Sequence, residues 1–356
     1  MCLIALAIGQ SARFPLVLAS NRDEFFDRPT SALDWWWPTP EGPAVLAGRD
    51  LQAGGSWLGL SATGRLALVT NVRDGQAPAP AAPSRGSLVT DWLLSSDSFE
   101  AEWARLAGAG HNGFNLIAAD LARGDWRWGC NRIGRGNGSQ AAVSQRLAAG
   151  LHGLSNAALD TPWPKVERLK AALRSALAGF EAERPLALLS PQAFGAAPAP
   201  VPADDCSALD GLVEQLFAAL GDAQPAEDAG LPATGLSLEL ERQLSAAFIR
   251  TPDGRYGTRC STLVITEATA AGQVMHVIER SFGVDQPDDA SAVQARSVER
   301  RARLALRPEF EPAGAAEARP HPAGNQPQTG KRPQEPSPRW LAGPTMEPVT
   351  ERMLPR

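Results

Sequence analysis

The sequence predicts an α/β protein in which antiparallel hairpins form sheets with helices packed on their faces. Short, almost wholly apolar runs occur in pairs joined by turns, and amphipathic helices lie between the pairs. The chain has 356 residues, of which 44% are hydrophobic, so it can bury a large core. Because apolar strands of this kind need cover on both faces, a layered sandwich is favoured over a βαβ repeat.

Four hairpins and one further strand account for the apolar runs. The first joins residues 2–8 to residues 15–20 through a polar stretch that contains Gly9. The second has a three-residue turn that ends at Gly64, which is typical of a hairpin connection. This second hairpin joins residues 56–61 to 65–71. The third joins 114–120 to 126–131, the fourth joins 261–267 to 273–280, and residues 151–155 form a separate strand.

Apolar residues at helical spacing predict four helices between these strands. Two short ones cover residues 87–95 and 98–107, and two longer ones cover 166–180 and 209–220. In the last of these the apolar positions repeat most strictly, from Leu209 to Leu220. Each helix has one apolar face, which is suited to covering a sheet.

The composition changes near residue 285. Residues 1–284 are expected to form one domain, and residues 285–356 a Pro/Gly/Arg-rich, mostly disordered tail in which a short helix could form over 291–307. The Ala-Pro stretch at 194–205 is expected to be a flexible connector.

Charge and motif content exclude several classes of function. With 34 basic and 39 acidic residues and no Lys/Arg-rich block in the first 280, nucleic acid is not expected as a partner. There is no signal-peptide pattern and no apolar run long enough to span a membrane. Four cysteines without a CxxC pair indicate a cytoplasmic protein, and four scattered histidines give no metal spacing, so no cofactor or metal is expected.

Cys2 is the first candidate for chemistry. The initiator Met is commonly removed before a small residue, which would leave Cys2 with both a thiol and a free α-amine. An α-amine has a pKa of about 7.7–8.0, so one residue could supply both nucleophile and base. The alternative is an ordinary small residue after Met1.

The run Ser20-Asn21-Arg22-Asp23-Glu24 ends the second strand of the first hairpin. Because the start of one hairpin strand lies beside the end of the other, these polar residues should lie next to Cys2. Arg22 would lower the pKa of the Cys2 thiol, and Asp23 could hold the α-amine. The alternative for this run is a solvated turn.

Ordered motifs along residues 1–283 resemble the NRDE family, also called the Transport and Golgi organisation protein 2 family. They begin with Met-Cys and the Asn-Arg-Asp-Glu run. The later motifs are Gly48-Arg49-Asp50, Gly54-Gly55-Ser56-Trp57, Thr70-Asn71-Val72-Arg73, Ser84-Arg85-Gly86, Gly113-Phe114-Asn115, Leu154-Ser155-Asn156, Thr161-Pro162-Trp163-Pro164-Lys165, Ala233-Thr234-Gly235, Glu241-Arg242 and Thr258-Arg259-Cys260.

This resemblance implies the α-β-β-α sandwich of N-terminal-nucleophile (Ntn) hydrolases, close in pattern to cysteine amidases that cleave bile-salt conjugates and penicillin V. The chain would then be a cysteine hydrolase acting on an amide-like C–N bond of a small molecule. The residues that match the catalytic pattern are Cys2, Arg22, Asp23, Asn71, Asn156 and Arg259. A rival implication is a non-enzymatic carrier for an apolar ligand such as haem or an acyl lipid.

Two features leave alternatives open. Cys260 stands where members of the family usually carry a small polar residue, so it is either a filler of similar size or a site of oxidation. Trp35-Trp36-Trp37 is either a lid over an apolar ligand or a segment packed at a sheet edge.

Overall fold

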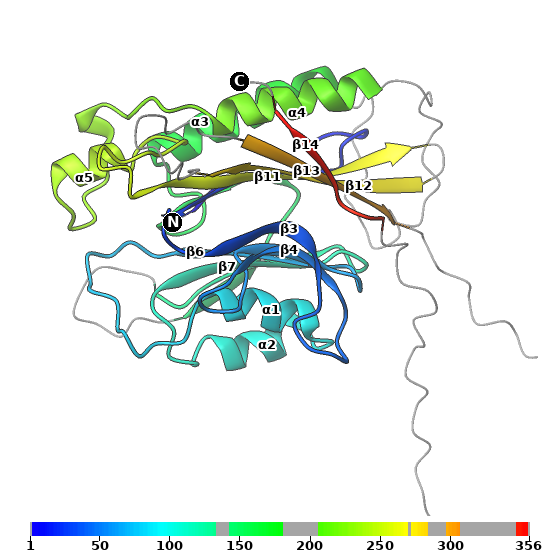
Figure 1. Ribbon diagram of the computed structural model, residues 1–356, viewed down its shortest axis with the longest axis horizontal. Coiled ribbons are helices and arrows are strands. Elements are labelled where there is room, and N and C mark those ends of the chain that lie inside the picture. Colours follow the sequence, from blue (N-terminus) through cyan, green and yellow to red (C-terminus); the bar gives the residue numbers. More distant parts are fainter. Residues whose placement is uncertain are drawn as a thin grey trace, which may run out of the picture.

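The computed structural model places two seven-stranded antiparallel sheets face to face, with helices on both outer faces (Figure 1). It describes residues 2–132, 142–180, 206–269, 272–283, 297–306 and 347–354. The predicted four-layer α-β-β-α sandwich of antiparallel sheets is confirmed.

The first sheet contains both ends of the described chain. Every pair of neighbouring strands in it is antiparallel. Its order is β10 (Gly150–Leu154), β1 (Cys2–Ile8), β2 (Leu16–Phe25), β11 (Tyr256–Thr269), β12 (Gly272–Phe282), β13 (Ser297–Leu306) and β14 (Thr350–Met353).

The second sheet follows the order of the chain. It consists of β3 (Thr30–Trp36), β4 (Val45–Asp50), β5 (Leu58–Ser61), β6 (Arg65–Asn71), β7 (Phe114–Asp120), β8 (Asp125–Cys130) and β9 (Val143–Arg146). The four predicted hairpins are all present. Strands β3, β4 and β9 were not predicted. β9 is largely exposed and β3 is only partly buried, and neither has the continuous apolar run that marks the predicted strands.

Helices cover the outer faces as expected. In Figure 1, α1 (Gly86–Leu94) and α2 (Phe99–Leu106) lie on the second sheet, and α3 (Pro164–Leu177) and α4 (Cys206–Leu220) lie on the first. A short helix that the sequence did not predict, α5 (Leu238–Gln243), lies beyond one end of the first sheet.

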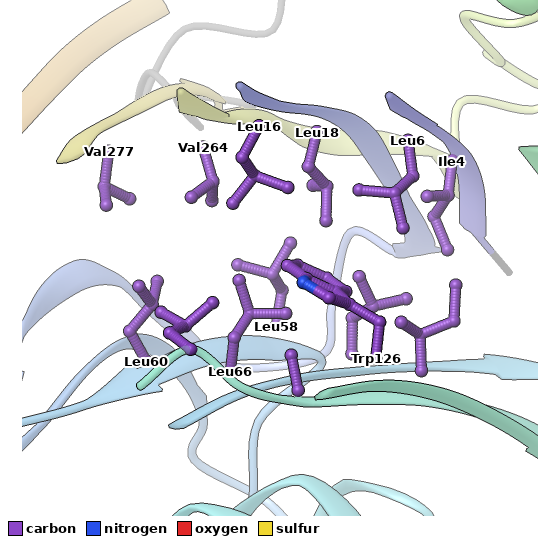
Figure 2. Packing of buried hydrophobic residues seen from close by; sticks show 14 of the residues in the cluster. Ile4, Leu6, Leu16, Leu18, Leu58, Leu60, Leu66, Trp126, Val264 and Val277 are labelled. Carbon is purple, nitrogen blue, oxygen red and sulfur yellow. The ribbon is translucent and has the colours of Figure 1, made fainter. Parts of the chain in front are cut away.

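The largest hydrophobic cluster lies between the two sheets (Figure 2). Alternate residues of β1 show how the layers divide: Ile4 and Leu6 point to the opposite sheet, while Leu3 and Ala5 pack with residues of α3 and α4. Both faces of β1 are therefore buried, as its apolar sequence predicts.

Residues 297–306 are a strand, which corrects the expected short helix over 291–307. They pair with β12 along ten positions, and Ala302 and Leu304 are buried while Arg303 between them is exposed, a period of two. The first sheet thus continues beyond residue 284 into the region expected to be a tail. The connector at 194–205 and the rest of the expected tail, apart from 347–354, lie outside the described residues.

Within the described ranges, no helix is long and apolar enough to cross a membrane.

Candidate active site at Cys2

The β1–β2 register places Cys2 directly opposite Arg22, as the hairpin predicted. Both side chains face the space between the sheets, where Cys2 is buried with 8% of its surface exposed. The guanidinium of Arg22 lies 4.2 Å from the centre of the Trp57 ring, and its Nη1 donates to Thr30 at 3.5 Å. These contacts fix the cation beside the thiol.

Trp57 needs space that a glycine provides. A Cβ atom at Gly48 would lie 2.3 Å from the Trp57 ring, so any other residue at this position would displace the ring. This contact gives Gly48-Arg49-Asp50 and the Trp57 motif a shared structural role, because the close approach at Gly48 positions the Trp57 ring that the Arg22 guanidinium packs against.

The pKa of the Cys2 thiol is raised, which corrects the expectation of a lowered value. Burial is the main cause; the charge of the N-terminal amine and that of Arg22 act in the opposite direction, while the carboxylate of Asp23 adds to the rise. At neutral pH the thiol is therefore protonated.

We expect Arg22→Ala to slow the alkylation of Cys2 by iodoacetamide about tenfold at neutral pH, because losing the cation raises the thiol pKa by about one unit. Peptide mass mapping over a pH series measures this. Arg259→Ala is the matched control, since its guanidinium binds other groups. In the wild type Cys2 should react faster than Cys260, whose pKa burial raises well above the usual value. An unchanged Cys2 rate in Arg22→Ala would contradict the assignment of Arg22.

Asp23 follows Arg22 on β2 and therefore points to the opposite side, toward the helix layer. It is 1% exposed, and its Oδ1 accepts a hydrogen bond from Thr258 Oγ1 at 2.7 Å. Burial raises the pKa of Asp23, while the charge of the N-terminal amine, the ammonium of Lys165 and the Thr258 hydroxyl lower it. Asp23 and Cys2 thus interact electrostatically from neighbouring strands.

Asn156 lies where the two sheets meet. Its Nδ2 donates to the backbone carbonyl of Asn71 at 3.0 Å, which joins the loop after β10 to the end of β6. Ser155 Oγ donates to the Cys2 carbonyl at 3.1 Å, so this loop also touches the candidate nucleophile. The structure therefore brings Cys2, Asn71 and Asn156 together, with the Asn71 backbone rather than its side chain in the hydrogen bond.

Arg73 and Glu241 form a buried ion pair behind Asn156 that the sequence did not identify as part of the site. Their charged atoms are 2.7 Å apart and their side chains are 6% and 3% exposed. Arg73 Nη2 also donates to Asn156 Oδ1 at 3.4 Å. Glu241 in turn accepts from the backbone N–H of Thr234 at 3.0 Å. Because Arg73 is only a donor, this contact turns the Nδ2 side of Asn156 away from Arg73.

Lys165 is a second group that sequence reasoning left out of the site. It is 2% exposed, and its Nζ donates to the carbonyl of Leu244 at 2.9 Å. Burial lowers its pKa from 10.5 to about 8, while Asp23 acts in the opposite direction. The feature of the sequence that could have identified Lys165 is its place in the family motif Trp163-Pro164-Lys165, at the start of a predicted helix.

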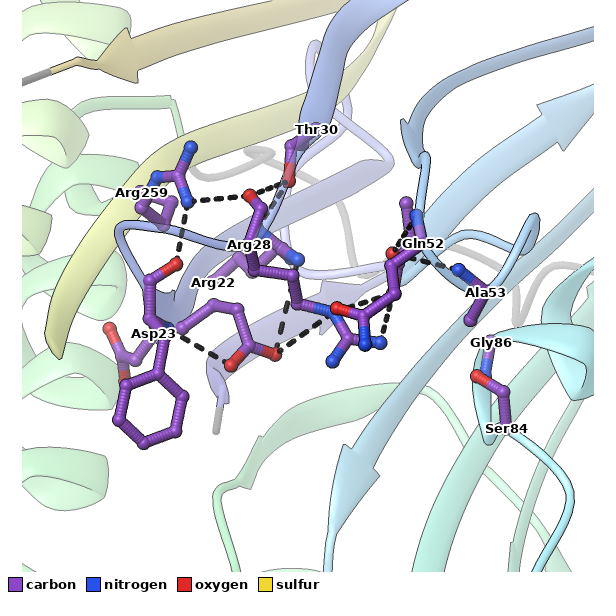
Figure 3. Close-up of polar contacts among 12 residues, drawn as sticks. Arg22, Asp23, Arg28, Thr30, Gln52, Ala53, Ser84, Gly86 and Arg259 are labelled. Atoms are coloured by element: carbon purple, nitrogen blue, oxygen red, sulfur yellow. Dashed lines mark hydrogen bonds and ion pairs between the residues drawn. The ribbon is translucent and has the colours of Figure 1, made fainter.

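Arg259 lies at a β-bulge of β11, beside Arg22 on the neighbouring strand. Its Nη1 donates to the backbone carbonyls of Phe25 and Arg28, at 2.7 and 3.1 Å. Figure 3 shows Arg259 beside Arg28. Arg259 therefore holds the turn after β2, and Arg28 in that turn pairs with Asp50 at 2.7 Å.

Cys260 also lies opposite Arg22, on the other side of β2 from Cys2. Two strand spacings separate the two cysteines by roughly 10 Å, which is too far for a disulfide. Cys260 is buried at 5% exposure with a strongly raised pKa, as expected for a residue that fills space.

A cavity of about 410 Å³ lies beside the segments that follow Asn71 and Asn156, although its lining includes neither asparagine and neither Cys2 nor Arg22. Its walls include Val72 and Ala157, the residues that follow Asn71 and Asn156, together with Trp163 and Pro232. Trp35, Trp36 and Trp37 do not line it. Strand β3, which holds Trp35 and Trp36, is an edge strand, and Trp36 Nε1 donates to the carbonyl of Ala47 on β4, which supports packing at the sheet edge.

Across the described part of the chain, no group of three or more His, Cys, Asp or Glu side chains is placed to hold a metal ion.

Comparisons with known proteins give one consistent family. The model of the family described as Transport and Golgi organisation 2 matches residues 1–283. A Transport and Golgi organization protein 2 homolog from Bos taurus is 34% identical over 268 residues, which cover 72% of this chain and 83% of that protein. The Homo sapiens homolog is 39% identical over 158 residues, covering 43% of this chain and 54% of its own length.

Solved structures were also compared. A mutant of conjugated bile acid hydrolase from Clostridium perfringens aligns with a TM-score of 0.36 at 10% identity, over 83% of this chain and 96% of that one. A Caenorhabditis elegans ortholog of N-acylethanolamine-hydrolyzing acid amidase aligns with a TM-score of 0.36 at 12% identity, over 74% and 92%.

Proposed function

The chain belongs to the Transport and Golgi organisation 2 family, and we propose that this member is a cysteine hydrolase that cleaves an amide-like C–N bond with Cys2 as its N-terminal nucleophile. One observation carries the proposal: Cys2 lies opposite Arg22 at a point that Asp23 and the Ser155-Asn156 loop also reach. This is a set of residues that nucleophilic acyl transfer can use.

In the proposed reaction, loss of Met1 makes the amine of Cys2 the α-amine. That amine takes the proton from Cys2 Sγ as the sulfur attacks the carbonyl carbon of the substrate. The tetrahedral intermediate collapses, the C–N bond breaks, and the leaving amine takes the proton back from the α-ammonium. Water then attacks the thioester with the same amine as base, releasing the acid and the thiol.

Burial of the thiol makes the base necessary. Because the pKa of Cys2 is raised, little thiolate exists before the substrate binds, and the proton must leave during the attack. Arg22 remains beside the sulfur and stabilises the developing negative charge. Asp23 orients the α-amine from the next position on β2.

Asn156 is the proposed donor to the oxyanion. Its carbonyl oxygen accepts from Arg73, and one hydrogen of its Nδ2 is bound by the Asn71 carbonyl. The second Nδ2 hydrogen can then donate to the developing oxyanion, from a side chain that is already fixed. Fixed donors of this kind contribute roughly 10²–10³ in rate.

The cavity lined by Ala157, the residue after Asn156, supports a binding role as well. Its Val72, Trp163 and Pro232 walls are suited to an apolar group, and the Arg132–Asp74 ion pair, 2.8 Å long, also lines it. In the hydrolase this space would receive the acyl part of the substrate. The second candidate, a carrier for an apolar ligand, uses the cavity without the chemistry of Cys2.

Release of free amine from a panel of N-acyl amides with acyl chains of increasing length tests the proposal. Hydrolysis by the wild type, fastest for chains that fit the cavity, is the expected result. Saturable binding of the same compounds with no amine released by the purified mature chain would favour the carrier instead.

A further inference from the structure

Lys165 is a buried charged group with no role in the reaction above. The chain has three lysines among its 34 basic residues, so arginine is by far its usual cation. One of these few lysines lies fully inside the protein near Cys2, whereas Lys170, five residues later, pairs with Asp160 and Glu167 at 3.3 Å. The residue type and its burial both require an explanation.

Its place on α3 makes a purely local role unfavourable. The helix begins at Pro164, so Lys165 is in the first turn, at the positive end of the helix dipole. A cation there is destabilised by the helix and by burial together. The Leu244 carbonyl satisfies one hydrogen of the ammonium, and the compensating charge must come from outside the helix.

Four charged or titratable groups act on the charge of Lys165 from the elements packed near it. Asp23 on β2, Cys2 on β1 and Glu241 on α5 favour its charged form, and Arg73 after β6 opposes it. Glu241 already has Arg73 as its partner at 2.7 Å. Asp23 is 1% exposed and points from β2 toward the helix layer that holds Lys165, and among the carboxylates its charge favours the Lys165 ammonium most, so we assign it as the carboxylate that Lys165 balances.

We propose that Lys165 is a positioning residue of the Cys2 site, whose ammonium balances the Asp23 carboxylate so that the α-amine of Cys2 is held in place and can still give up its proton. This inference rests on the proposed role of that amine as base. A carboxylate alone beside an amine favours the protonated amine, which cannot accept a proton from the thiol. A neighbouring ammonium offsets that effect.

The small number of lysines makes the pair directly measurable. Lysine-selective ¹³C labelling gives three side-chain signals by NMR, which Lys165→Met and Lys170→Met assign. The wild-type Lys165 signal should titrate near pH 8, following its pKa of about 8. Asp23→Asn should lower that midpoint by about one unit or more, because the balancing carboxylate is lost. Asp160→Asn, which removes a partner of Lys170, is the control and should leave the Lys165 midpoint unchanged.

A second readout follows the amine itself. The reagent 2-cyanobenzothiazole reacts only with a residue that carries both a thiol and a free α-amine, so its labelling of Cys2 can be followed against pH. Lys165→Met should move this profile upward by about one pH unit, and Lys170→Met should leave it unchanged. This measurement tests the positioning role of Lys165 even if the Asp23→Asn variant does not fold.

The outcomes separate this inference from the proposed function. Suppose that 2-cyanobenzothiazole labels Cys2. If Asp23→Asn then leaves the titration midpoint of Lys165 unchanged, or if Lys165→Met leaves the pH profile of labelling unchanged, the inference is overturned and the hydrolase proposal stands. If the wild type neither labels nor hydrolyses amides while Asp23→Asn still lowers the Lys165 midpoint, the proposed function fails and only the electrostatic pair remains, so the positioning role falls with it.

Discussion

Cys2→Ala is expected to lower kcat for amide hydrolysis by about 10⁴-fold or more, because no other group in the site can form the thioester. The melting temperature should stay close to that of the wild type, since the change removes one sulfur atom from the edge of the core. Steady-state release of amine, with thermal melting of the same samples, measures both effects.

Cys130→Ala is the matched control for that substitution. Cys130 is also buried, at 1% exposure, but it lies on β8 in the other sheet, where its thiol contacts the backbone of Arg132. The Cys130→Ala variant should hydrolyse amides at the wild-type rate. Comparable hydrolysis by Cys2→Ala and the wild type would show that the reaction does not pass through Cys2.

Glu241→Gln is expected to destabilise the fold by about 3–5 kcal/mol, because it leaves the buried Arg73 guanidinium without its carboxylate. The effect should reach the site as well, since Arg73 holds Asn156. Chemical denaturation gives the free energy of unfolding, and kcat measured well below the unfolding transition gives the catalytic part.

Glu239→Gln makes the same chemical change two residues earlier on α5. Its side chain is 64% exposed and pairs with the surface residue Arg242 at 2.6 Å, so water replaces the lost interaction. Stability should be essentially unchanged. Equal losses in the two variants would mean that burial of the Arg73–Glu241 pair has no energetic consequence.

The core strands and the first part of the site could be predicted from the sequence because both are local. Hairpin strands carry apolar runs and short turns, and a hairpin between residues 2–8 and 15–20 forces Cys2 and Arg22 to be neighbours. Strand β13 could not be predicted in this way. Its arginines resemble a solvated helix, and the sheet position that it occupies depends on β12.

The supporting residues depend on contacts between distant parts of the chain. Arg73 and Glu241 are 168 residues apart, and the sequence around each residue does not indicate that the other is its partner. The raised pKa of Cys2 also escaped prediction, because a sequence shows the nearby Arg22 but not the extent of burial that outweighs it. The family motifs marked these positions without showing what each contacts.

The central claim is that residue 2 carries a thiol and a free α-amine that act together. Treatment of the purified protein with 2-cyanobenzothiazole, followed by intact mass and peptide mapping, tests it most directly. The account predicts a chain without Met1 that takes up one adduct, located on Cys2. A main species that retains Met1 and takes up no adduct would contradict the N-terminal-nucleophile mechanism.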